Sequence, residues 1–116
     1  MIYTNIIMEI LVEWAKKRTP NTYSELSKAY RKKTGEWHEP HGTWDHHLGD
    51  INRSLAEKGA PPISALVIRK DTIEPGGKFW GCAPNVPERS KDVKTRMVKW
   101  VKLLNAVFDY DWDGYY

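Results

Sequence analysis

Apolar side chains recur at the spacing of a helix in four stretches of this chain. These stretches predict helices over residues 4–17, 22–35, 43–58 and 90–109. The start of the second helix is well marked, because Thr22 followed by Glu25 has the spacing of a capping box. Gly59 stands directly after the third stretch, where a glycine commonly ends a helix. We therefore expect a mainly helical chain.

A different pattern lies between the third and fourth predicted helices. Pro61-Pro62 leads into Ile63–Ile68, a short apolar run that contains β-branched residues. A polar turn at Gly76-Gly77 then precedes Phe79-Trp80. Short apolar runs around a glycine turn are typical of two antiparallel strands. Helix, helix and hairpin together predict an α+β fold, a winged helix-turn-helix of three helices plus a β-hairpin wing, with an added C-terminal helix.

The length of 116 residues fits a single domain over residues 1–116. We divide it into helices and wing (1–89), a C-terminal helix (90–109) and an acidic aromatic tail (110–116). The C-terminal helix is expected either to complete the core or to form a dimer interface. The one cysteine, Cys82, cannot form an internal disulfide, and no apolar run is long enough to span a membrane. These features predict a cytoplasmic protein.

Charge is unevenly distributed along the chain, although the net charge is only +3. Basic residues dominate residues 16–33 and 69–102, whereas residues 36–57 and the tail are acidic. Such a polarised domain can offer one basic face to an anionic partner. An ordinary solvated helical surface explains the same pattern equally well.

Several short motifs between Thr22 and Gly81 occur in an order that is similar to a known family. They are Tyr23, Glu25, Pro62, Val67, Gly76-Gly77 and Trp80-Gly81. About half of the chain in this way resembles the DNA-binding domain of alkylguanine alkyltransferases and alkyltransferase-like proteins. The resemblance implies a DNA-binding topology but no alkyl transfer, because Ile63-Ser64-Ala65 stands where that family has its reactive Cys-His-Arg motif.

The predicted function is therefore that of a small, non-enzymatic protein that binds double-stranded DNA. The third helix is expected to lie at the groove, and basic residues of the second helix and the wing are expected to contact phosphates. The predicted contacts are Lys28, Arg31, Lys32, Lys33, His46, Asn52, Arg53, Arg69, Lys70 and Lys78. Asp45, Asp50 and Glu57 weigh against this reading, because carboxylates on a groove-facing helix repel phosphates. Gly49 in the middle of the third helix suggests that a phosphate or another helix approaches its backbone closely.

Histidines and aromatic residues leave further alternatives open. All four histidines lie within residues 38–47 beside acidic residues, but their spacing matches no zinc or nuclease signature, so we expect no metal and no cofactor. Trp37 and Trp112 lie outside the apolar stripes, where they could stack on unpaired bases or anchor a protein interface.

The competing function is a protein-binding module without enzymatic activity. In that reading the chain is an accessory or inhibitor of phage or mobile-element type. It would dock on a nucleic-acid enzyme through the acidic residues 36–57 and the tail acids Asp109, Asp111 and Asp113. A homodimer is a further possibility. DNA binding is the favoured prediction, and these partners are the alternatives.

Overall fold

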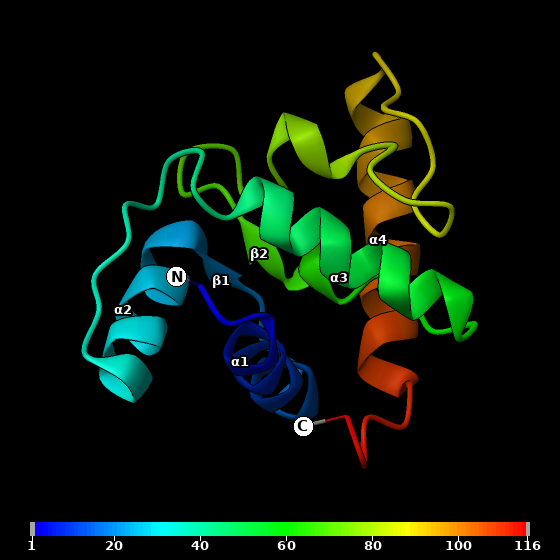
Figure 1. The fold of residues 1–116 in the computed structure, drawn as a ribbon. Helices are drawn as coiled ribbons and strands as arrows, with labels where there is room; N and C mark the ends of the chain where they lie inside the picture. The colour runs from blue at the N-terminus through cyan, green and yellow to red at the C-terminus, as the bar shows by residue number, and fades with distance from the viewer. Residues whose placement is uncertain (1, 116) are drawn as a thin grey trace.

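The computed structural model describes residues 2–115, which form four α-helices and a two-stranded parallel sheet (Figure 1). The elements are α1 (Thr4–Lys16), β1 (Asn21–Thr22), α2 (Tyr23–Thr34), α3 (Asp45–Glu57), β2 (Val67–Ile68) and α4 (Val93–Asp109). Two 3-10 turns, η1 (Ile63–Leu66) and η2 (Gly77–Phe79), lie before and after β2. The α+β class is as predicted, and all four helices lie close to their predicted ranges.

The ends of the helices show which local signals were correct. The Thr22 hydroxyl accepts a hydrogen bond from the Glu25 backbone N–H at 3.2 Å, so Thr22 caps α2 as predicted. Gly35 ends the same helix with a φ of 82°, a conformation that glycine adopts without strain. The cap of α4 is Asp92, whose carboxylate accepts a hydrogen bond from the Thr95 N–H at 3.1 Å.

The prediction of a β-hairpin over residues 63–80 is wrong. Residues 63–66 form η1, and Phe79 lies in η2. Within residues 63–80 only Val67 and Ile68 form a strand, and they pair in parallel with Asn21 and Thr22. All six residues from Ile63 to Ile68 are buried, and a fully buried run has the same pattern in a strand and in a helical turn. Asn21 and Thr22 are both polar, so no apolar or alternating pattern predicted a strand there.

The turn η1 lies at the centre of the core. It packs against α1, α3 and α4, and Ile63, Ala65 and Leu66 are fully buried. The indole of Trp100 in α4 donates to the carbonyl of Ala65 at 2.9 Å. One side of α4 thus completes the core. Among residues 2–115, no helix has the length and apolar character that crossing a membrane requires.

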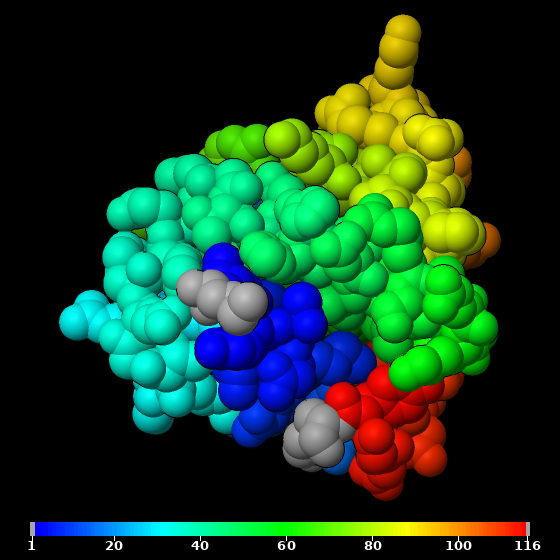
Figure 2. Space-filling model, in the orientation of Figure 1, coloured from blue at the N-terminus to red at the C-terminus, as the bar shows by residue number. Residues whose placement is uncertain are grey.

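The segment after α4 folds back on the domain over residues 110–115. Trp112 is 2% exposed, and its indole donates to the Val107 carbonyl at 2.7 Å. In Figure 2 this segment, drawn in red, meets the end of α3, drawn in green. There the ammonium of Lys58 lies 5.5 Å from the ring centre of Tyr115.

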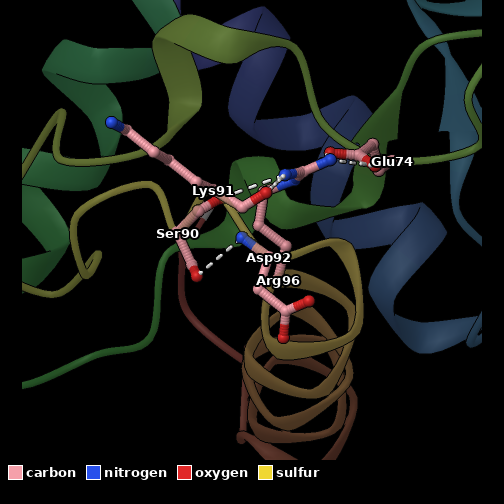
Figure 3. A network of polar contacts seen from close by, with 5 residues as sticks. All are labelled: Glu74, Ser90, Lys91, Asp92 and Arg96. Carbon is pink, nitrogen blue, oxygen red and sulfur yellow. Dashed lines mark hydrogen bonds and ion pairs between the residues drawn. The ribbon is translucent and has the colours of Figure 1, made fainter.

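A buried ion pair fastens the segment after β2 to the start of α4 (Figure 3). Nε of Arg96 donates to Glu74 at 2.9 Å, and both side chains are almost fully buried. The same guanidinium donates to the Ser90 carbonyl at 3.0 Å. The segment also closes on itself, because the Arg69 N–H donates to the Glu74 carbonyl at 2.8 Å. Residues 69–76 are therefore held in place from two sides.

Candidate nucleic-acid interface

A hollow in the surface measures about 710 Å³ and lies where several elements begin or end. One wall is the start of α2, residues 22–24, and another is the connection before α3, residues 40–42. Residues 68–71 after β2 and residues 76–78 at the start of η2 close the remaining sides. Segments from three separate regions of the sequence thus meet around one concave site.

Tyr23 and Gly76 form a close contact in the wall of this hollow. The Tyr23 hydroxyl accepts a hydrogen bond from the Gly76 N–H at 3.2 Å. A Cβ at Gly76 would lie 2.9 Å from that hydroxyl oxygen, so the contact requires glycine. Burial raises the pKa of Tyr23 to about 12, and the hydrogen bond from Gly76 only partly opposes this shift. Tyr23 is therefore neutral at physiological pH.

Three of the predicted DNA contacts lie around the hollow. Arg69, Lys70 and Lys78 all line it and are all exposed. Arg69 forms a forked pair with Asp71, with distances of 3.1 and 3.0 Å from its nitrogens to the two carboxylate oxygens. Lys70 and Lys78 make no ion pair with any residue between 2 and 115. Two free ammonium groups thus stand at the edge of the hollow.

Three further predicted contacts continue from the hollow along α2. Ser24 lines the hollow, and Lys28 and Arg31 follow it at i+4 and i+7, which places them on one helix face. Lys32 lies beside them, and all three basic residues are exposed. Lys28 pairs with Glu25 at 3.3 Å. Together with the cations around the hollow these residues form what we call the basic surface: Lys28, Arg31, Lys32, Arg69, Lys70 and Lys78.

The prediction that Lys33 belongs to this surface is wrong. Lys33 points to α1, where its ammonium lies 3.0 Å from Glu9 and 3.4 Å from Glu13. The hydrogen bond to Glu9 is the main reason that the pKa of Lys33 is raised. Because two carboxylates already neutralise it, Lys33 holds α2 against α1 and is not available to a phosphate.

Asn52 is also excluded from the interface, contrary to prediction. It is 0% exposed, and its amide donates to the hydroxyl of Ser64 at 2.6 Å. The Asn52 carbonyl oxygen accepts from the Ser64 N–H at 3.3 Å. A side chain that is fully buried and bonded on both ends cannot contact a base edge. Asn52 instead connects α3 to η1.

The exposed face of α3 is close to neutral. His46, Asp50, Arg53 and Glu57 lie along it, so two acids face one arginine and one histidine. Arg53 pairs with Asp50 and donates to the Cys82 carbonyl at 2.9 Å, and His46 lies 3.3 Å from the same Asp50. The two predicted contacts His46 and Arg53 are thus exposed but already partnered.

Gly49 is buried, and the nearest atoms to a side chain at this position belong to Arg53 of the same helix. A Cβ at this position would lie 3.3 Å from Nη1 of Arg53, one turn further along α3. The guanidinium of Arg53 therefore covers Gly49. The close approach predicted for this position comes from within the same helix.

The histidines do not form a metal site. Among residues 2–115, no group of three or more His, Cys, Asp or Glu side chains is placed to hold an ion. His38 packs edge-on against Tyr30, with 5.3 Å between ring centres. Burial, followed by the neighbouring His46, lowers the pKa of His47. His41 lines the hollow, which its place in a histidine-rich stretch did not indicate.

The tail acids and the two unassigned tryptophans also have defined places. Asp109 pairs with Arg18 at 3.1 Å and Asp113 with Lys16 at 3.0 Å, so the tail neutralises the end of α1 and not the basic surface. Trp112 is buried, which corrects its proposed role as a stacking platform. Trp37 is 45% exposed and remains available for such a contact.

The chain was compared with known proteins at the level of families, curated sequences and solved structures. No family model matches it, and neither a curated protein nor a solved structure is significantly similar to it.

Proposed function

We propose that this chain is a small, non-enzymatic protein that binds double-stranded DNA along its phosphate backbone. The observation that carries the proposal is the basic surface, where six cations lie on α2 and around the hollow. Glu25, Asp45 and Asp71 are the acids among or beside them, which leaves a clear excess of positive charge. Clustered lysine and arginine release counterions from DNA when they contact its phosphates, and this drives association.

The proposed mode of binding depends little on base sequence. The base-reading residues expected on α3 are not available, because Asn52 is buried and Arg53 is paired with Asp50. Phosphate contacts fix the position of a protein on a duplex but carry no sequence information. We therefore assign the main contact to α2 and the hollow, and no longer to α3.

The proposed fold type is a modified winged helix, in which a loop replaces the β-hairpin wing. In this proposal α2 and α3 act as the helix-turn-helix, and residues 69–78 take the place of the hairpin wing beside the start of α2. Tyr23 and Gly76, two residues that carry the resemblance to alkyltransferase-like proteins, contact each other in the wall of the hollow, and this supports the proposal. Alkyl transfer is not proposed, since no thiol stands at residues 63–65.

The proposal is tested by the salt dependence of DNA binding. Fluorescence anisotropy with a labelled random-sequence duplex should show binding at low salt that weakens steeply as salt is added. The double variant Arg31→Gln/Lys32→Gln should reduce the slope of log K against log salt by about 2, because about 0.9 counterion is released for each phosphate contact. The loss should be similar for duplexes of different sequence.

The matched control is Lys17→Gln, which removes an exposed positive charge at the end of α1, outside the basic surface. This variant should keep the slope of the unmodified chain. Absence of binding at low salt contradicts the proposal. An equal loss in Lys17→Gln would mean that only the net charge matters and that the basic surface has no special role.

A further inference from the structure

The outer side of α4 exposes an unusual amount of apolar surface. Val93, Val98 and Val101 are 56%, 57% and 45% exposed. They are three of the six large apolar residues that are exposed among residues 2–115. The half-buried Met97 and Leu104 extend the stripe at helical spacing. We call Val93, Met97, Val98, Val101 and Leu104 the α4 face; contiguous apolar patches of this kind mark interaction sites.

The charge next to the α4 face has a single sign. Between Asp92 and Asp109 the helix carries Lys94, Arg96, Lys99 and Lys102 but no acidic residue. Arg96 is buried and paired with Glu74, whereas the three lysines make no ion pair with any residue the structure describes. The two flanking acids are in use, since Asp92 caps α4 and Asp109 pairs with Arg18. The expected partner therefore carries negative charge.

The two exposed lysines Lys94 and Lys102 border the stripe on its outer edge. At 100° per residue, Lys94 projects between Val93 and Val98, and Lys102 projects beyond Val101 on the same side. A helix laid on the stripe would place one of its flanks beside both ammonium groups. Acidic residues on that flank would meet them at a spacing of about two helical turns.

A second copy of this chain fits the α4 face poorly. In an antiparallel pair centred on Val101, the two Lys102 side chains would lie together beside the dyad. In a parallel pair, the lysines of each copy would find no acidic residue on the facing helix. Like charges at such positions oppose association. The charge pattern thus argues against a homodimer and for a partner of different composition.

We propose that the α4 face binds an acidic amphipathic helix of another protein. The apolar stripe would bury the leucine-type face of that helix, and Lys94 and Lys102 would pair with its acidic flank. The part of the basic surface on α2 lies on the opposite side of the domain from α4 (Figure 1), whereas the segment that carries Arg69 and Lys70 contacts the start of α4 through Glu74.

The test uses the whole chain and a synthetic helical peptide of about 18 residues, with leucines at i, i+3, i+4 and i+7, glutamates on the flanks and alanine elsewhere. Amide chemical shifts of the isotope-labelled chain should change along α4 on addition of the peptide. The double variant Lys94→Glu/Lys102→Glu should weaken binding about tenfold or more, and Val98→Glu should do the same. Lys99→Glu, on the other flank of α4, is the matched control and should bind as the unmodified chain does.

Other outcomes would overturn the proposal. These are no shift change with the peptide at about 1 mM, changes away from α4, or equal binding of a peptide with lysines in place of the glutamates. If sedimentation equilibrium shows a dimer that Val98→Glu dissociates, the α4 face binds a second copy of the chain and not another protein. If Lys94→Glu/Lys102→Glu loses duplex binding, the α4 face contacts DNA and not a protein. Lys94 and Lys102 are exposed and Lys99 is half-buried, and circular dichroism checks that the variants are folded.

Discussion

The hydroxyl of Tyr23 joins two sides of the hollow, because it accepts the Gly76 N–H across the site. Because this hydroxyl is buried, its ionisation also changes the free energy of unfolding. In the unfolded chain a tyrosine loses its proton near pH 10, whereas the folded Tyr23 retains it up to about 12. The unfolded state then binds fewer protons, so the free energy of unfolding falls as pH rises through this window.

This effect predicts a difference between the unmodified chain and Tyr23→Phe. The unmodified chain should lose about 2 kcal/mol of stability from this group between pH 10 and pH 12. The Phe variant should be less stable at neutral pH, since Gly76 loses its acceptor, but should lack that part of the alkaline loss. Urea unfolding across this pH range measures both quantities.

The control is Tyr3→Phe, which removes a hydroxyl from an exposed side chain. Its alkaline loss of stability should equal that of the unmodified chain. If the free energy of unfolding falls with pH in the same way in Tyr23→Phe and Tyr3→Phe, the alkaline loss of stability does not come from Tyr23.

At the scale of single residues the sequence predicted side-chain chemistry better than side-chain position. Arg31 and Lys32 are exposed as expected, but Lys33, next in sequence, turns to Glu9 and Glu13 of α1. Asn52 is bonded to Ser64, twelve residues away in the chain. Helical periodicity gives the direction of a side chain on its own helix. It does not show which other element lies opposite.

Among the elements, the helices were predictable and the segment after α3 was not. Each helix has an apolar stripe, and α2 also has Thr22 and Gly35 as signals at its two ends. The run from Ile63 to Ile68 lacks such information, because every position is buried and alternation is absent. The pairing partner of β2 is a polar dipeptide, so long-range packing decided this part of the fold.

The link between α4 and the segment 69–76 yields a prediction at the element scale. Glu74→Gln removes one charge of the buried pair and leaves Arg96 uncompensated (Figure 3). Breaking a buried pair in this way should lower the free energy of unfolding by about 3 kcal/mol. It should also loosen Arg69 and Lys70, so DNA affinity should fall. Chemical denaturation and anisotropy measure the two effects.

Two comparisons separate this explanation from a general loss of charge. Asp71→Asn breaks the exposed pair with Arg69 and should leave the free energy of unfolding nearly unchanged. The double variant Glu74→Leu/Arg96→Met should recover much of the stability lost in Glu74→Gln, since no isolated charge remains buried. If Glu74→Gln is as stable as the unmodified chain, the pair does not hold the segment.

For the whole molecule, the C-terminal segment is part of the packed structure and not a separate arm. Trp112 closes the core, and the ion pairs of Asp109 and Asp113 hold the segment to the end of α1. Trp112→Ala should therefore destabilise the domain by about 3 kcal/mol or more. The same substitution at the exposed Trp37 should change stability by about 0.5 kcal/mol at most. Urea unfolding of both variants checks this contrast, and equal costs would contradict it.

The parallel pairing of β1 with β2 has a consequence for how the chain folds during synthesis. A parallel pair cannot close through a tight turn, and here α2 and α3 lie between its two members. A nascent chain that has emerged only through α3 can form local helical turns, but β1 still lacks the neighbour that fixes it. The start of α2 is then free to move until Val67 and Ile68 leave the ribosome, and completion of the domain must wait for them.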